Sequence, residues 1–130
     1  MARRNCPTRY AEAAARGRAA ETAAARYLEA RNFRVLLRNY RCRMGELDIV
    51  ALAPDNTLVL AEVRLRSRQD YGGGAASVDH RKQQRLLRAG RHLLATHPHW
   101  SGHALRFDVL DVRRADDNME IHWIQHAFEA

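Results

Sequence analysis

The stretch Gly45-Glu-Leu-Asp-Ile-Val-Ala-Leu-Ala53 is followed, after Pro54-Asp-Asn56, by a second apolar run, Thr57-Leu-Val-Leu-Ala-Glu-Val-Arg-Leu-Arg66. Short apolar runs that are bounded by turn residues are typical of strands buried inside a sheet. Pro, Asp and Asn between the runs favour a tight turn. The two runs therefore predict an antiparallel hairpin, with strands over 46–53 and about 57–66.

A carboxylate interrupts each of these buried runs, Asp48 in the first and Glu62 in the second. If the turn is centred on Asp55, so that Ala53 faces Thr57, then Asp48 lies directly opposite Glu62. Directly opposed β-carbons in an antiparallel pair are about 4.5–5.5 Å apart. A register shift of one residue would instead place the two carboxylates on opposite faces of the sheet.

Two opposed carboxylates in a dry sheet need compensation, because burying an unpaired charge is costly. One interpretation is a divalent cation between Asp48 and Glu62, since Mg²⁺ prefers oxygen ligands. Glu21 could add a third carboxylate, because it lies within the apolar stripe of the preceding helix. The other interpretation is neutralisation by ion pairs with nearby arginines, namely Arg41, Arg43 and Arg64.

The remaining segments predict an α/β chain with a mixed sheet flanked by helices. Capping residues and apolar spacing indicate helices from Thr8 to about Ala30 and from Ser77 to about Thr96, and strands near 34–41, 104–112 and 119–124. Short turns make the first three strands an antiparallel meander, and a helical crossover makes the next pair parallel. Residues 1–15 are predicted to be a basic arm and the start of the first helix, and 16–130 a single domain.

The chain carries a formal net charge of +7 and has a sequence pI of about 10.4. This excess of basic over acidic residues favours a polyanionic partner, because Lys and Arg displace counterions from phosphates. A basic protein without such a partner is the alternative. Cys6 and Cys42 form no CxxC or zinc-binding spacing, and the sequence shows no signal segment or membrane span. We therefore expect a cytoplasmic protein with no membrane partner.

Basic side chains concentrate on the second predicted helix and after the third strand. The helix predicts either a phosphate-binding face or an ordinary solvated face, formed by Arg81, Lys82, Arg85, Arg88 and Arg91. Arg66 and Arg68 precede a glycine-rich loop at 71–75, which we interpret either as a flap over a substrate or as a plain connector.

An ordered set of motifs resembles the YraN family of bacterial proteins, from about Arg16 to the C-terminus. These motifs are Gly17…Glu21, Arg38-Asn39, Gly45-Glu-Leu-Asp48, Glu62-Val-Arg64, Lys82-Gln83 and Arg106-Phe-Asp108. The family is regarded as a group of predicted endonucleases. It is distantly similar to archaeal Holliday-junction resolvases and to PD-(D/E)xK restriction-type nucleases. The resemblance implies a restriction-endonuclease-like core of order α-β-β-β-α-β.

The resemblance also implies a metal-dependent endonuclease site. By position, Glu21, Asp48 and Glu62 would hold Mg²⁺, with Mn²⁺ as a substitute, and Glu46 would support them. Arg64 would join these three carboxylates as a catalytic residue. The reaction implied is hydrolysis of DNA phosphodiester bonds, including those of branched DNA, and a homodimer is implied by analogy with resolvases. The residues expected to contact nucleic acid are Arg64, Arg66, Arg68, Lys82, Gln83 and Arg85.

Arg64 departs from the family pattern, which usually has Lys at this position. Because Arg is effectively always protonated, it cannot serve as a general base, although it can bind a phosphate. Two alternatives to the endonuclease therefore remain open. One is a non-catalytic nucleic-acid-binding module on a degenerate nuclease scaffold. The other is an interaction domain whose basic face meets an acidic protein.

Overall fold

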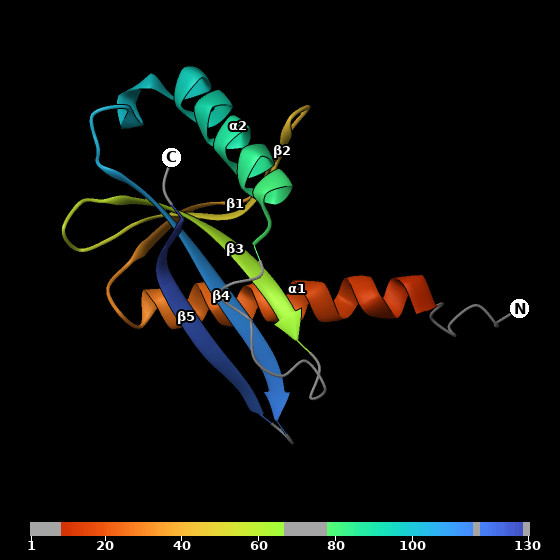
Figure 1. The fold of residues 1–130 in the computed structure, drawn as a ribbon. Coiled ribbons are helices and arrows are strands. Elements are labelled where there is room, and N and C mark those ends of the chain that lie inside the picture. Colours follow the sequence, from red (N-terminus) through yellow and green to blue (C-terminus); the bar gives the residue numbers. More distant parts are fainter. Residues whose placement is uncertain (1–8, 67–77, 116–117, 129–130) are drawn as a thin grey trace, which may run out of the picture.

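Five strands form one mixed sheet that is covered by a helix on each face, in a computed structural model that describes residues 9–66, 78–115 and 118–128 (Figure 1). The elements are α1 (Arg9–Glu29), β1 (Arg34–Cys42), β2 (Gly45–Leu52), β3 (Leu58–Arg66), α2 (His80–Thr96), the 3₁₀ turn η3 (Pro98–Trp100), β4 (Leu105–Ala115) and β5 (Asn118–Phe128). The predicted α/β class and element order are confirmed. The last segment is longer than expected and forms a complete fifth strand.

The strands follow one another across the sheet in the order β1-β2-β3-β4-β5. Neighbouring strands are antiparallel except β3 and β4, which are parallel because α2 carries the chain back between them. In the β2–β3 hairpin, Ile49 faces Ala61 and Leu52 faces Leu58. The main-chain N–H of Ala53 donates to the carbonyl of Thr57 at 2.9 Å. Of the registers that the sequence left open, the structure therefore has the one centred on Asp55.

Each helix buries an apolar stripe against one face of the sheet. Ala20, Ala24 and Leu28 recur at every fourth position of α1 and pack against a cluster that includes Ile49 and Leu110. A second cluster joins α2 to the sheet through side chains that include Leu86, Ala89, Leu93, Leu60 and Phe107. Successive residues of β3 alternate between the two clusters, Val59 and Ala61 in the first and Leu60 in the second, so the clusters lie on opposite faces of the sheet. Figure 1 shows α1 and α2 on different sides of the strands.

Close contact between α2 and the sheet depends on glycine at two positions. A β-carbon at Gly90 would lie 2.9 Å from Cδ1 of Leu60, which is fully buried. A β-carbon at Gly45, at the start of β2, would lie 3.1 Å from the main-chain oxygen of Arg85. Glycine therefore lets α2 approach both the middle of β3 and the first residue of β2.

The start of α2 differs from the prediction. Asp79 is the N-cap: its backbone is extended and its side chain accepts a hydrogen bond of 2.8 Å from the main-chain N–H of Lys82. Asp caps helices at least as well as Ser does, so the local signal was ambiguous. Ser77, Thr8 and the loop at 71–75 lie outside the described residues. Within the described residues, neither helix combines the length and hydropathy needed to cross a membrane.

Asp108 anchors β5 to β4 and is 1% exposed. Its carboxylate accepts hydrogen bonds from Nε and Nη2 of Arg106 at 2.9 and 3.1 Å, from Nε1 of Trp123 at 2.9 Å and from the main-chain N–H of His126 at 2.9 Å. The His126 backbone has φ of 53° at a bulge in the β4–β5 pairing. These bonds give Asp108 a structural role.

Candidate functional site

The site begins where β2 and β3 part. Their main-chain pairing ends at Ile49 and Ala61, one position before Asp48 would face Glu62. Beyond that point the main-chain N–H of Val63 donates to Oδ2 of Asp48 at 2.8 Å. The Asp48 carboxylate therefore lies between the two strands and takes the place of a main-chain acceptor.

The surroundings of Asp48 oppose its negative charge. Burial is the main cause that raises the pKa of Asp48 to about 7, and the charges of Glu62, Glu21 and Glu46 add to the rise. The hydrogen bond from Val63 acts in the other direction. Among the described residues, no Lys or Arg forms an ion pair with Asp48. A cation bound beside this carboxylate would be stabilised electrostatically.

Glu21 reaches the site from α1 and is held there by β1. Its Oε1 accepts a hydrogen bond of 2.8 Å from Nδ2 of Asn39 and lies 3.4 Å from Nε of Arg38. Asn39 has φ of 57°, in the left-handed region that Asn tolerates better than most residues. This backbone bend presents the Asn39 amide to Glu21, which is 8% exposed.

Glu21 and Asp48 open into one cavity of about 360 Å³ between α1 and the sheet. Glu46 also lines it, but its side chain is 54% exposed and pairs with Arg41 at 3.3 Å. Glu46 therefore contributes charge at the rim of this cavity, which we call the Asp48 cavity.

Glu62 lies on the other side of β3 and contacts α2. Its Oε2 lies 3.0 Å from Nζ of Lys82, the chain's only lysine, and Glu62 is 7% exposed. Asp79 caps α2 and so fixes the first turn that carries Lys82. A cavity of about 340 Å³, here called the Glu62 cavity, is lined by Glu62, Val63, Arg64, Arg66, Asp79 and Lys82.

The three predicted metal ligands line two neighbouring cavities. Within the described ranges, no three His, Cys, Asp or Glu side chains are gathered so that they could hold a metal ion. Glu21 and Asp48 line one cavity and Glu62 lines the other, with Val63 common to both. The shared metal site expected of Glu21, Asp48 and Glu62 stays a prediction. In this structure the three side chains line two neighbouring cavities, because β3 directs Glu62 toward α2 while Asp48 lies between the strands.

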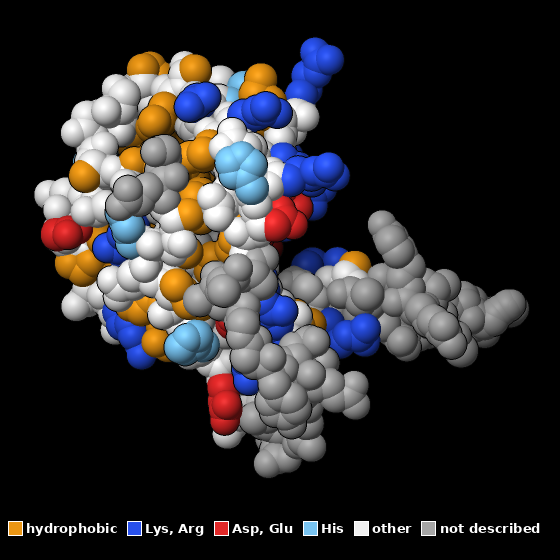
Figure 2. Space-filling view, viewed as in Figure 1, with side chains coloured by type: hydrophobic (Ala, Val, Ile, Leu, Met, Phe, Trp, Pro, Cys, Tyr) orange, Lys and Arg blue, Asp and Glu red, His pale blue; other side chains and the backbone are white. Residues whose placement is uncertain are grey.

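The residues expected to contact nucleic acid fall into three groups. Arg64, Arg66 and Lys82 line the Glu62 cavity, and Arg66 also approaches the buried Asp111 at 3.5 Å. Gln83 donates to the main-chain carbonyl of Val78 at 2.9 Å, and neither it nor the exposed Arg85 lines either cavity. Arg68 lies outside the described residues. Figure 2 shows Lys and Arg side chains beside acidic ones along the recessed edge above α1.

Sequence reasoning missed several residues that shape the site. Asn39 and Arg38 were noticed only as a motif, yet they hold Glu21 in place. Asp79 was overlooked because Ser77 offered an equally good capping signal. Asp111 was also missed: it is 1% exposed, and its Oδ2 has no hydrogen-bond partner among the described atoms. An acidic residue inside the apolar run of β4 was the available signal.

Comparisons with known proteins agree on one family. A family model described as "Uncharacterised protein family UPF0102" matches residues 20–112. The chain is 42% identical over 119 residues to a UPF0102 protein of Stutzerimonas stutzeri, covering 92% of this chain and 98% of that one. It is 48% identical over 119 residues to a UPF0102 protein of Ralstonia nicotianae, covering 89% and 88%. The matched range includes Glu21, Asp48, Glu62 and Lys82.

Proposed function

We propose that this chain, which belongs to the uncharacterised protein family UPF0102 (the YraN family), binds nucleic acid and hydrolyses phosphodiester bonds with a divalent cation. The proposed substrate is DNA, including branched DNA. The proposal goes beyond family membership and rests on the chemistry of the two carboxylate cavities.

The observation that carries the proposal is the state of Asp48. Its carboxylate is held between two strands, near three other carboxylates and without a cationic partner among the described residues. Such a group is costly to keep ionised unless a cation joins it. Glu21 and Glu62 have basic partners in Arg38 and Lys82, so Asp48 is the acid that would gain most.

The donor chemistry fits a hard cation. Asp48 would be its first ligand, and Glu62 and Glu21 would complete the set by turning from Lys82 and Arg38 toward it. All three supply the oxygen ligands that Mg²⁺ and Mn²⁺ take. A divalent cation bound there would stabilise the charge that develops on a phosphate during hydrolysis. Glu62 and Glu21 lie close enough to Asp48 for their charges to raise its pKa, which supports a cation shared among these acids.

The basic residues of the Glu62 cavity would bind and orient the phosphate. Arg64 and Arg66 can donate paired hydrogen bonds to phosphate oxygens. Lys82 can donate to the phosphate and can also hold or release a proton next to Glu62. The net charge of +7 supports attraction of a polyanion.

A second candidate function is nucleic-acid binding without cleavage. Arg64 favours this second function. It occupies the position two residues after Glu62, where a guanidinium cannot act as a general base as an amine could. In this case the carboxylate cavities would be a retained scaffold feature, and the basic residues would still bind phosphates.

The test is strand cleavage of labelled linear, flap and four-way-junction DNA in Mg²⁺, Mn²⁺ or EDTA. Wild type is compared with Asp48→Asn, with Arg64→Lys, and with Asp55→Asn as a matched control in the exposed hairpin turn. We expect metal-dependent cleavage that Asp48→Asn lowers by at least about 100-fold and that Asp55→Asn leaves unchanged.

Two other outcomes would change the proposal. Tight DNA binding without cleavage by wild type, and cleavage by Arg64→Lys, would favour the binding module on a disabled nuclease scaffold. Absence of both binding and cleavage in all variants would contradict both candidate functions.

A further inference from the structure

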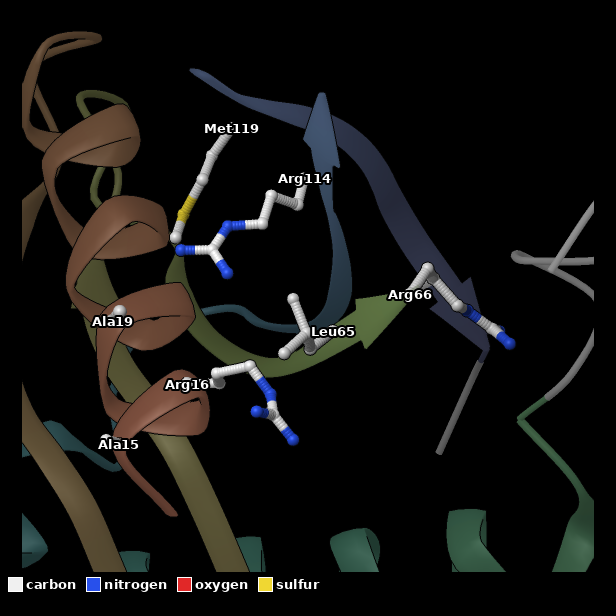
Figure 3. A pocket seen from close by; sticks show the side chains of 7 residues that line it. All are labelled: Ala15, Arg16, Ala19, Leu65, Arg66, Arg114 and Met119. Carbon is white, nitrogen blue, oxygen red and sulfur yellow. The ribbon is translucent and has the colours of Figure 1, made fainter. Parts of the chain in front are cut away.

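A third cavity, of about 500 Å³, lies on the α1 side of the sheet where the chain leaves β3 (Figure 3). Its apolar wall is formed by Ala15 and Ala19 of α1, Leu65 of β3 and Met119 of β5. Leu65 is 39% exposed, one of two large apolar side chains with high exposure among the described residues. The volume falls within the range of roughly 300–1,000 Å³ that is usual for small-ligand sites.

Two arginines border this apolar wall from different elements. Figure 3 shows Arg16 extending from α1 and Arg114 extending from β4, with Leu65 between them, while Arg66 points away. None of the described residues that line the cavity is acidic. A guanidinium plane can stack on a nucleobase or bind a phosphate with two hydrogen bonds. The cavity therefore combines an apolar surface for a flat ring with positive charge for an anion.

The cavity neighbours the proposed site. Leu65 also lines the Asp48 cavity, and Arg66 also lines the Glu62 cavity. Leu65 follows Glu62 by three positions in β3, which corresponds to about 10 Å along an extended strand. A strand of nucleic acid whose phosphate lay beside Asp48 and Glu62 would thus bring a neighbouring nucleotide to this cavity.

We propose that this cavity receives one unpaired nucleotide of the bound strand, with its base against Leu65 and Met119 and its phosphates near Arg16 and Arg114. The inference rests on the proposed function and specifies its substrate class. A base inside a duplex must first be unpaired and unstacked, at a cost of a few kcal/mol, whereas a base in a flap, gap or single-stranded end need not be. Substrates with an unpaired nucleotide are therefore favoured over continuous duplex.

The test is a binding measurement in EDTA, so that cleavage plays no part. The probes are two fluorescent hairpin DNAs with a single-stranded overhang, one with normal thymidines and one with abasic sites throughout the overhang. We expect wild type to bind the normal overhang about tenfold more tightly, equivalent to about 1.4 kcal/mol. Leu65→Asn is expected to reduce this preference to less than about twofold, because it should weaken binding of the normal overhang and leave binding of the abasic overhang unchanged.

Matched controls separate the cavity from general effects of charge and folding. Met44→Asn changes the other exposed large apolar side chain and should keep the full preference. Arg114→Gln should weaken binding of both probes several-fold, whereas Arg34→Gln, at the other end of the sheet, should have less effect on both. Thermal unfolding of each variant shows that it is folded.

The outcomes distinguish this inference from the proposed function. Equal affinity of wild type for the two probes, or an unchanged preference in Leu65→Asn, overturns the cavity as a nucleotide site but leaves cleavage at Asp48 untouched. The expected preference without cleavage by wild type overturns the catalytic proposal alone. Failure to bind either probe overturns the nucleotide site, and the cleavage assay in Mg²⁺ then decides the proposed function by itself. Loss of self-association in Leu65→Asn, with equal probe binding, would assign the cavity to a second copy of the chain.

Discussion

Nζ of Lys82 lies 3.0 Å from Oε2 of Glu62, which joins the first turn of α2 to the buried part of β3. Glu62 is 7% exposed, whereas the Lys82 side chain is half exposed. The chain thus brings its only lysine to the carboxylate that precedes Arg64 by two positions. At position 64 of β3 the chain has Arg and so no amine, but Lys82 of α2 brings an amine to the same cavity.

Lys82→Met should lower metal-dependent cleavage by about 100-fold, if Lys82 moves a proton at the reacting phosphate. Lys82→Arg keeps the charge but not the titratable amine, so it should restore DNA affinity without restoring the rate. Rates at saturating DNA and affinities in EDTA measure the two effects separately. Equal rates for all three proteins would remove Lys82 from the proposed mechanism.

The stability of the metal-free protein should fall as pH rises through the range set by Asp48. Its pKa is raised from 3.8 to about 7, so between these values the folded state holds a proton that the unfolded chain has released. The free energy of unfolding therefore decreases from about pH 4 to pH 7 and then levels off. The loss from this group amounts to at most roughly 4 kcal/mol.

Asp48→Asn tests this dependence by urea unfolding in EDTA. The variant should be more stable than wild type at pH 8 and close to it at pH 4.5, because Asn carries no charge to bury. Mg²⁺ at pH 8 should stabilise wild type more than the variant. A difference in stability that is the same at both pH values would show that the Asp48 carboxylate does not titrate as described.

Asp108→Asn should destabilise the protein by about 3–5 kcal/mol, because it breaks a buried pair with Arg106 and weakens the bonds to Trp123 and His126. The matched change Asp55→Asn, in an exposed turn, should cost about 1 kcal/mol or less. Urea denaturation at pH 7 compares the two variants. Similar losses from both would contradict the anchoring role given to Asp108.

Gly90→Ala and Gly17→Ala make the same change in two helices but should act in opposite directions. At Gly90 the new methyl group would meet Leu60 at 2.9 Å, and overpacking of about 1–3 kcal/mol should outweigh the gain in helix propensity. At Gly17 nothing lies within 4 Å, so Ala should stabilise α1 by about 0.5–1 kcal/mol. Thermal unfolding that shifts both melting temperatures in one direction would contradict this packing.

The hairpin illustrates how far local pattern reaches. The apolar runs and the turn residues predicted the hairpin but left its register open, and the structure has the pairing centred on Asp55, in which Ala53 bonds to Thr57. The same pattern could not show that pairing ends at Ile49. The Asp48 carboxylate accepts a hydrogen bond from the main-chain N–H of Val63. This arrangement depends on the neighbouring strands and on α1.

The carboxylates of the site could be recognised in the sequence because each interrupts an apolar stretch. The residues that pair with them could not be recognised in this way. Asn39 reaches Glu21 through a left-handed backbone position, and Lys82 reaches Glu62 from α2. Contacts of this kind join segments far apart in the chain, so no local spacing encodes them. The apolar cavity beside Leu65 is likewise formed by four separate elements.

Local periodicity and ordered motifs were enough to predict the α/β class, the element order, the hairpin and the family. The hairpin register and the opening of Asp48 and Glu62 into neighbouring cavities became evident only in the folded chain. These features depend on burial, charge repulsion and helix placement, which act together on side chains that the fold brings close.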